Sequence, residues 1–217
     1  MRLFWIALAC VLSLTARANV PLTEALGNGP PIPAAPKLQA TGYLLIDATN
    51  VEVLVEQNAD QPLPPASLTK MMTAYIAERE IAEGRISFDD KVPVSIKAWK
   101  TGGSRMFIRE GTEVRLEDLL RGIVIQSGND ASVAVAEYIA GSEDVFADVM
   151  NKTAVSLGMT KTQFKNSTGL PQEGHYTTAK DLGILAARTI ADFPETYASY
   201  KEKNFTYNGI KQANRNS

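Results

Sequence analysis

The sequence has few of the residues that build metal centres and disulfides. It contains one cysteine, Cys10, and one histidine, His175, among 217 residues. A protein-built zinc site uses several cysteine, histidine or carboxylate ligands, so this composition argues against one. Cys10 lies in an N-terminal stretch that we expect to be removed, which leaves the mature chain without a disulfide or a thiol nucleophile. Carboxylates could still hold magnesium, but we expect no cofactor.

An excess of charge of one sign is also missing. The chain has 22 basic and 24 acidic residues, a formal net charge of −2, and no basic patch stands out. We therefore expect no nucleic-acid partner. Hydrophobic residues make up 45% of the chain, which is enough to bury a core and excludes a disordered or fibrous protein.

The apolar run at the N-terminus is too short for a good membrane span. Residues 1–18, MRLFWIALACVLSLTARA, combine an early arginine, an apolar stretch and a small-x-small ending. This pattern predicts a secretory signal peptide cleaved before Asn19, whereas a permanent anchor would need a longer run. We expect the protein to be exported, to the periplasm or the outer face of the cytoplasmic membrane.

The rest of the chain predicts a short leader and one α+β domain. Residues 19–37 contain GNGPPIPAAPK and predict an extended leader, so the folded domain would span 38–217. Two strands joined by a tight turn are expected between Thr41 and Gln57, followed by a block of helices and a returning strand at 201–212. The predicted helices cover residues 66–83, 115–126, 130–141, 142–158 and 179–193, with Ser142 and Thr178 as N-caps and Gly158 as a stop.

Ser67 and Lys70 offer a nucleophile and a base at the start of a helix. Residues three apart share a helix face with Cβ atoms about 5–6 Å apart, so the two side chains could meet. A lysine can take the serine proton if burial lowers its pKa, and a serine in the first turn keeps an unpaired N–H for an oxyanion. Taken alone, Ser-x-x-Lys indicates a capped helix more than a catalytic pair.

Ser127-Gly128-Asn129 interrupts two predicted helices sixty residues downstream. Such a break can project a hydroxyl and an amide into a cleft, although an ordinary turn has the same composition. Ser-x-x-Lys followed in order by Ser-x-Asn is the signature of the penicillin-interacting serine enzymes.

On these motifs the chain resembles the low-molecular-mass penicillin-binding proteins that act as D-alanyl-D-alanine carboxypeptidases. The segments ASLTKMMTAYI, LLRGIVIQSGNDASVAVAEYIAGSEDVFADVMN and FKNSTGLPQEGHYTTAKDL carry the resemblance, which extends over about residues 37 to 217. It implies a fold like that of penicillin-binding proteins and β-lactamases, in which an antiparallel sheet accompanies a helical subdomain.

The resemblance also implies roles for four residues. Ser67 would be the nucleophile, Lys70 the general base and Ser127 a proton relay, while Asn129 would bind the substrate amide and help to orient Lys70. The substrates would be peptidoglycan stem peptides, and β-lactams would acylate Ser67 as covalent inhibitors.

The third family element, a Lys-Thr-Gly strand, follows the other two in chain order. Lys100-Thr101-Gly102 spells it but precedes Ser127, so we interpret it as a coincidental loop. The resemblance then implies that the C-terminal strands, with the second oxyanion donor and any membrane-attaching region, are missing from these 217 residues. We expect this form to have weak or no activity.

Two alternatives remain open from the sequence. A β-lactamase would need a deacylating glutamate, for which Glu173 is a weak candidate because no Glu-x-x-x-Asn pattern lies near it. A non-catalytic peptidoglycan-binding fragment is the other. His175 could suggest a Ser-His-Asp triad, but its loop position and the better-placed Lys70 favour a structural role.

Overall fold

The computed structural model describes residues 35–215, and the chain divides into two units, 1–37 and 38–217. The predicted signal peptide, and the predicted leader up to residue 34, lie outside the described residues. No helix in the described part of the chain is long and apolar enough to cross a membrane.

Unit 38–217 is an α+β fold with seven α-helices among its described residues. The helices are α1 (Lys70–Ala82), α2 (Ile96–Lys100), α3 (Leu116–Gln126), α4 (Asn129–Ala140), α5 (Glu143–Leu157), α6 (Ala179–Asp192) and α7 (Pro194–Tyr197). Two 3-10 helices, η1 (Ala66–Thr69) and η2 (Ala198–Lys201), accompany them. The strands are β1 (Tyr43–Asp47), β2 (Glu52–Gln57), β3 (Lys91–Pro93), β4 (Glu113–Arg115), β5 (Asn204–Tyr207) and β6 (Ile210–Ala213).

The strands of the described residues form three separate antiparallel pairs, β1 with β2, β3 with β4 and β5 with β6. The prediction of a single returning strand at 201–212 was wrong, because the chain turns back within this segment and forms the two paired strands β5 and β6. Asn208 and Gly209 both have positive φ, 47° and 74°, and form the turn between β5 and β6. Asn-Gly is the preferred pair for such a two-residue hairpin turn.

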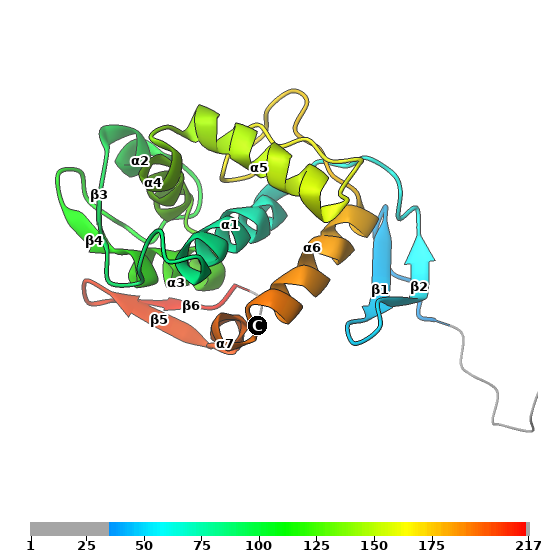
Figure 1. Cartoon of the computed structure of the whole chain (residues 1–217). Coiled ribbons are helices and arrows are strands. Elements are labelled where there is room, and N and C mark those ends of the chain that lie inside the picture. Colours follow the sequence, from blue (N-terminus) through cyan, green and yellow to red (C-terminus); the bar gives the residue numbers. More distant parts are fainter. Residues whose placement is uncertain (1–34, 216–217) are drawn as a thin grey trace, which may run out of the picture. The chain divides into compact units, whose positions relative to one another are not determined.

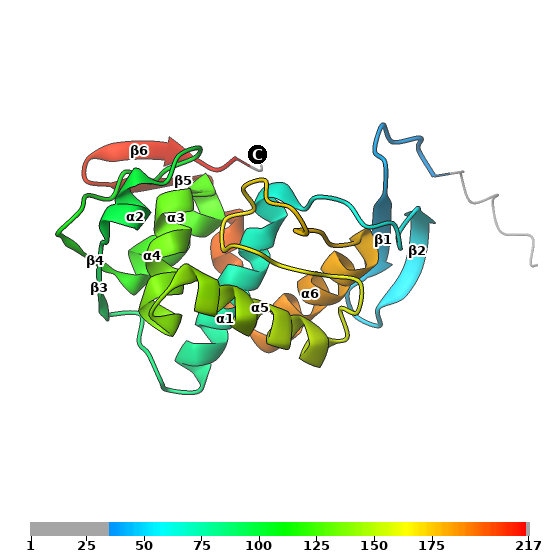
Figure 2. The same ribbon diagram turned by 90° about the horizontal axis from the view of Figure 1, so that it is seen from above.

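Helix α1 lies in the middle of the helical block. Figures 1 and 2 show α3 and α4 on one side of it and α6 on the other, and α1 contacts all three as well as α5. The predicted helix at 66–83 starts as η1 and becomes α-helical at Lys70. The sequence predicted no helix between Gly84 and Val114, where the structure has α2.

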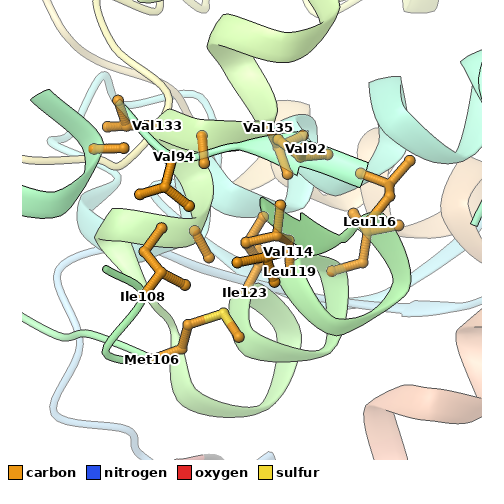
Figure 3. Packing of buried hydrophobic residues seen from close by; sticks show 14 of the residues in the cluster. Val92, Val94, Met106, Ile108, Val114, Leu116, Leu119, Ile123, Val133 and Val135 are labelled. Atoms are coloured by element: carbon orange, nitrogen blue, oxygen red, sulfur yellow. The ribbon is translucent and has the colours of Figure 1, made fainter. Parts of the chain in front are cut away.

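Buried side chains form two clusters that meet along α1 and α4. One joins α3 and α4 to β3 and β4, and Figure 3 shows ten of its labelled members: Val92, Val94, Met106, Ile108, Val114, Leu116, Leu119, Ile123, Val133 and Val135. The other joins α1, α5 and α6 around Phe146, Met150 and Phe164. Helix α1, which is packed on several sides, begins at Lys70, and Ser67 lies in η1 directly before it.

Candidate active site

Ser67 and Lys70 lie in contact at the junction of η1 and α1. Lys70 Nζ is 3.2 Å from Ser67 Oγ, and it donates a second hydrogen bond of 2.6 Å to the carbonyl oxygen of Thr168. Ser67 is exposed whereas Lys70 is only 4% exposed. No side-chain cap hydrogen bond is made at either helix start, so the Ser67 hydroxyl does not act as a cap. The capped-helix interpretation of Ser-x-x-Lys is therefore wrong here.

The environment of Lys70 suits a general base. Burial, with a smaller contribution from the positive charge of Arg215, lowers the pKa of Lys70 from 10.5 to about 8. At pH 7 roughly one Lys70 in ten is then neutral, compared with fewer than about one in a thousand for a solvated lysine. A neutral amine in contact with Ser67 Oγ can accept its proton.

A close backbone approach fixes the position of the Ser67 turn. Ala66 has a φ of 47°, which is uncommon for a residue with a Cβ atom. Gly169, with a φ of 82°, lies so near that a Cβ atom on it would be 1.7 Å from the Ala66 carbonyl oxygen. Only glycine fits at 169, and the loop can therefore pack directly against Ala66, the residue before Ser67.

Ser127 and Asn129 lie in the break between α3 and α4, as predicted. Ser127 ends α3 in the left-handed conformation, with φ 61°, and Asn129 begins α4. Asn129 Nδ2 donates to the Gly102 carbonyl and its N–H donates to the Ser104 carbonyl, both at 2.7 Å. Since the hydrogen-bond partners of Lys70 are Ser67 and Thr168, Asn129 does not orient Lys70 directly.

All four predicted residues line one cleft of about 960 Å³. Its walls come from η1 and the start of α1, the α3–α4 break, the loop around Gly103, the loop 168–171 and the C-terminal segment at Asn214 and Arg215. A cleft of this size can take a small peptide or a β-lactam. No group of three potential metal ligands occurs in residues 35–215.

Asp130 lies outside the cleft lining but supports the site, a role that the sequence analysis missed. Its buried carboxylate accepts hydrogen bonds from the N–H groups of Met106, Phe107 and Ile108, at 2.9, 2.9 and 3.2 Å. It thereby fixes the loop that follows the carbonyl partners of Asn129. Nothing in the sequence around Asp130 indicates that it binds a loop more than twenty residues earlier in the chain.

His175, the Lys-Thr-Gly tripeptide and Glu173, to which the sequence assigned no catalytic role, lie outside the contact between Ser67 and Lys70. His175 Nε2 lies 2.9 Å from Thr69 Oγ1, and Lys165 N–H points to His175 Nδ1, so the ring joins a loop to η1 without contacting Ser67. Burial lowers the pKa of His175. Lys100 ends α2 and Thr101 is its C-cap, so Lys-Thr-Gly does not form a strand here, and the Gly102 carbonyl accepts a hydrogen bond from Asn129. Glu173 is exposed.

Comparisons with known proteins agree with this geometry. A family model described as D-alanyl-D-alanine carboxypeptidase matches residues 30–217. The D-alanyl-D-alanine carboxypeptidase DacA of Escherichia coli K12 is 44% identical over 191 residues, which are 85% of this chain and 47% of that protein. DacF of Bacillus subtilis is 43% identical over 171 residues, 76% of this chain and 44% of its own. The chain thus spans about half the length of the curated relatives it matches.

Solved structures give the same result. Penicillin-binding protein 5 of Haemophilus influenzae superposes with a TM-score of 0.82 at 41% identity, over 84% of this chain and 54% of that one. Penicillin-binding protein D2 of Listeria monocytogenes in its ampicillin-bound form gives 0.74 at 28% identity, over 84% of this chain and 74% of its own. The fold, the contact between Ser67 and Lys70 and the family match together assign this chain to the D-alanyl-D-alanine carboxypeptidase family.

Proposed function

We propose that the protein is a serine-type D-alanyl-D-alanine carboxypeptidase that removes the terminal D-alanine from peptidoglycan stem peptides. The observation that carries this proposal is the 3.2 Å contact between Ser67 Oγ and the buried Lys70 Nζ, whose pKa is lowered to about 8. The names of the relatives support a carboxypeptidase over a β-lactamase.

In the proposed reaction Ser67 Oγ attacks the carbonyl carbon between the two terminal D-alanines, and Lys70 Nζ takes the hydroxyl proton. The bond to the leaving nitrogen breaks, Ser127 relays a proton to it, and D-alanine departs from an acyl-enzyme. Water then hydrolyses the ester. Asn129 Nδ2 is bound to Gly102, so its Oδ1 is the atom that we expect to accept a substrate N–H.

We further propose that β-lactams acylate Ser67 and that the protein acts outside the cytoplasmic membrane. The ampicillin-bound relative supports the first statement, and the N-terminal pattern of residues 1–18 supports the second.

A fluorescent penicillin tests the proposal on the purified protein. We expect covalent labelling that Ser67→Ala abolishes. In a separate assay without the penicillin, we expect D-alanine to be released from a D-alanyl-D-alanine peptide, and Ser67→Ala to abolish this release. Labelling that survives Ser67→Ala would refute the assignment of the nucleophile. Sustained nitrocefin turnover would indicate a β-lactamase, and muropeptide binding without any labelling would indicate a non-catalytic protein.

A further inference from the structure

A buried carboxylate outside the motif residues holds the loop that contacts Lys70. Glu143 begins α5, and its side chain is 10% exposed. Its Oε1 accepts hydrogen bonds from the backbone N–H and the hydroxyl of Ser167, at 3.1 and 2.8 Å. Its Oε2 lies 2.9 Å from Lys97 Nζ. Burial alone would raise the pKa of Glu143, but the bonds from Lys97 and Ser167 outweigh it and hold that pKa below its ordinary value.

Ser167 connects this carboxylate to the catalytic helix. The Ser167 carbonyl accepts a 2.8 Å hydrogen bond from Thr73 Oγ1, and the next carbonyl, that of Thr168, accepts the 2.6 Å bond from Lys70 Nζ. Lys70 and Thr73 are three residues apart on α1 and so share a face. Two consecutive carbonyls are thus fixed against α1 on one side while Glu143 holds Ser167 from the other.

The loop between these contacts is itself stiff. Asn166 Oδ1 accepts hydrogen bonds from the N–H groups of Thr168 and Gly169, at 3.2 and 2.8 Å, and from Thr168 Oγ1 at 3.0 Å. Because these bonds tie the loop together, we expect a displacement of Ser167 to shift the Thr168 carbonyl as well.

The same carboxylate links two walls of the cleft. Lys97 belongs to α2, which leads into the segment whose carbonyls at Gly102 and Ser104 accept the hydrogen bonds of Asn129. The ion pair between Lys97 and Glu143 therefore joins the Asn129 wall to the Thr168 wall. Lys97 is half exposed, so its ion pair with Glu143 contributes little. The two buried hydrogen bonds between Glu143 and Ser167 contribute most of the stabilisation of the loop.

We propose that Glu143 is a positioning residue that sets the Thr168 carbonyl against Lys70, with Lys97 as its counter-ion. Glu143 does not touch the reacting atoms and acts through Ser167 and Thr168. The inference rests on the proposed function, because it concerns the base of that reaction.

The experiment combines amide hydrogen exchange of residues 166–170 with the acylation kinetics of a fluorescent penicillin, both on the purified protein. In Glu143→Ala we expect faster exchange in this loop and an acylation rate constant about 10- to 100-fold lower per folded molecule. Initial binding of the penicillin should change much less. Glu143→Gln should recover part of the rate, because its amide oxygen can still accept from Ser167 but carries no charge for Lys97.

Glu137→Gln is the matched control. Glu137 also carries a negative charge near Lys97, but it accepts its hydrogen bond from Ser95 Oγ, at 2.6 Å, and has no contact with the loop. We expect this variant to keep the exchange and the acylation rate of the parent protein. If Glu143→Ala fails to fold, Ser167→Ala removes the hydroxyl bond alone and should show the same two effects more weakly.

The outcomes separate this inference from the proposed function. Unchanged exchange of 166–170 in both Glu143 variants would refute the inference, whatever the labelling shows. Faster exchange with an unchanged acylation rate would refute it as well, because the loop would then not position the base. A parent protein that takes no label would refute the proposed function, and the exchange result would still decide whether Glu143 holds the loop.

Discussion

Glu78 is a buried acid without the partners that such a group needs at neutral pH. It lies on α1, is 5% exposed, and its Oε2 has no hydrogen-bond partner among the described residues. Burial raises the pKa of Glu78 from 4.5 to about 7, against a small lowering by a hydrogen bond from Thr196. The ionised form is therefore poorly accommodated in the folded protein. We predict that Glu78→Gln makes the protein more stable at alkaline pH relative to the parent.

The size of the effect follows from the two pKa values. A carboxyl whose pKa is 4.5 when unfolded and about 7 when folded loses on the order of 3 kcal/mol of folding free energy between those pH values. The sign is set by proton binding: in this window the folded state holds the proton more tightly, so stability falls as pH rises. Glutamine does not titrate. Its unpaired amide costs about 1–3 kcal/mol at every pH and cancels when two pH values are compared.

Urea unfolding followed by circular dichroism at about pH 4 and about pH 8.5 measures this difference. We subtract the free energy of unfolding of the parent from that of Glu78→Gln at each pH. This difference should increase by about 3 kcal/mol from the lower to the higher pH. Glu80→Gln is the control, because the bonds of Arg85 hold the pKa of Glu80 below its ordinary value and its replacement should act in the opposite direction. Parallel pH dependence in the parent and Glu78→Gln would refute the reasoning.

Three further predictions concern the cleft. The acylation rate should rise with pH through about 8 as Lys70 becomes neutral, and a flat profile measured with a fluorescent penicillin would contradict its role as the base. Gly169→Ala should abolish labelling and strongly destabilise the fold, because its Cβ would collide with the Ala66 carbonyl oxygen, whereas Gly158→Ala, with a similar φ of 84° and open space, should cost only about 1–2 kcal/mol in urea unfolding. Asp130→Ala should lower the free energy of unfolding by at least about 3 kcal/mol, since three backbone N–H groups lose their acceptor. A loss below about 1 kcal/mol would mean that water replaces the carboxylate.

The helix boundaries were predictable because their signals are local. Ser142 Oγ accepts from the N–H of Val145, and Thr178 Oγ1 accepts from that of Asp181, which confirms both predicted N-caps. Gly158 ends α5 in the left-handed conformation, as predicted. Each of these features depends on residues within three or four positions of each other, where side-chain chemistry decides the outcome.

The support of Lys70, the proposed base, was not predictable by the same means. The partner of Lys70, the Thr168 carbonyl, is 98 residues away and belongs to the backbone, so its identity leaves no mark on the sequence. Glu143 looks like an ordinary acid in the first turn of a helix, where it would be favourable without any tertiary contact. Only the fold shows that it also binds Ser167. Motif spacing thus predicted that Ser67 and Lys70 lie together, but not which residues hold them.

Glu143 and Glu78 show how differently a buried carboxylate behaves when its partners differ. Burial raises the pKa of both, yet three donors reverse the effect for Glu143 while Glu78 has almost nothing to offset it. Lys70, on the same helix as Glu78, has its pKa lowered to about 8 by burial. The ionised Lys70 destabilises the fold at low pH, and this destabilisation is relieved only as pH rises from about 8 toward 10.5. The destabilisation by ionised Glu78, in contrast, is complete above about pH 7. Between about pH 7 and 8 helix α1 therefore carries two poorly solvated charges at once. The two groups together stabilise the fold least in the pH range where Lys70 begins to lose its proton.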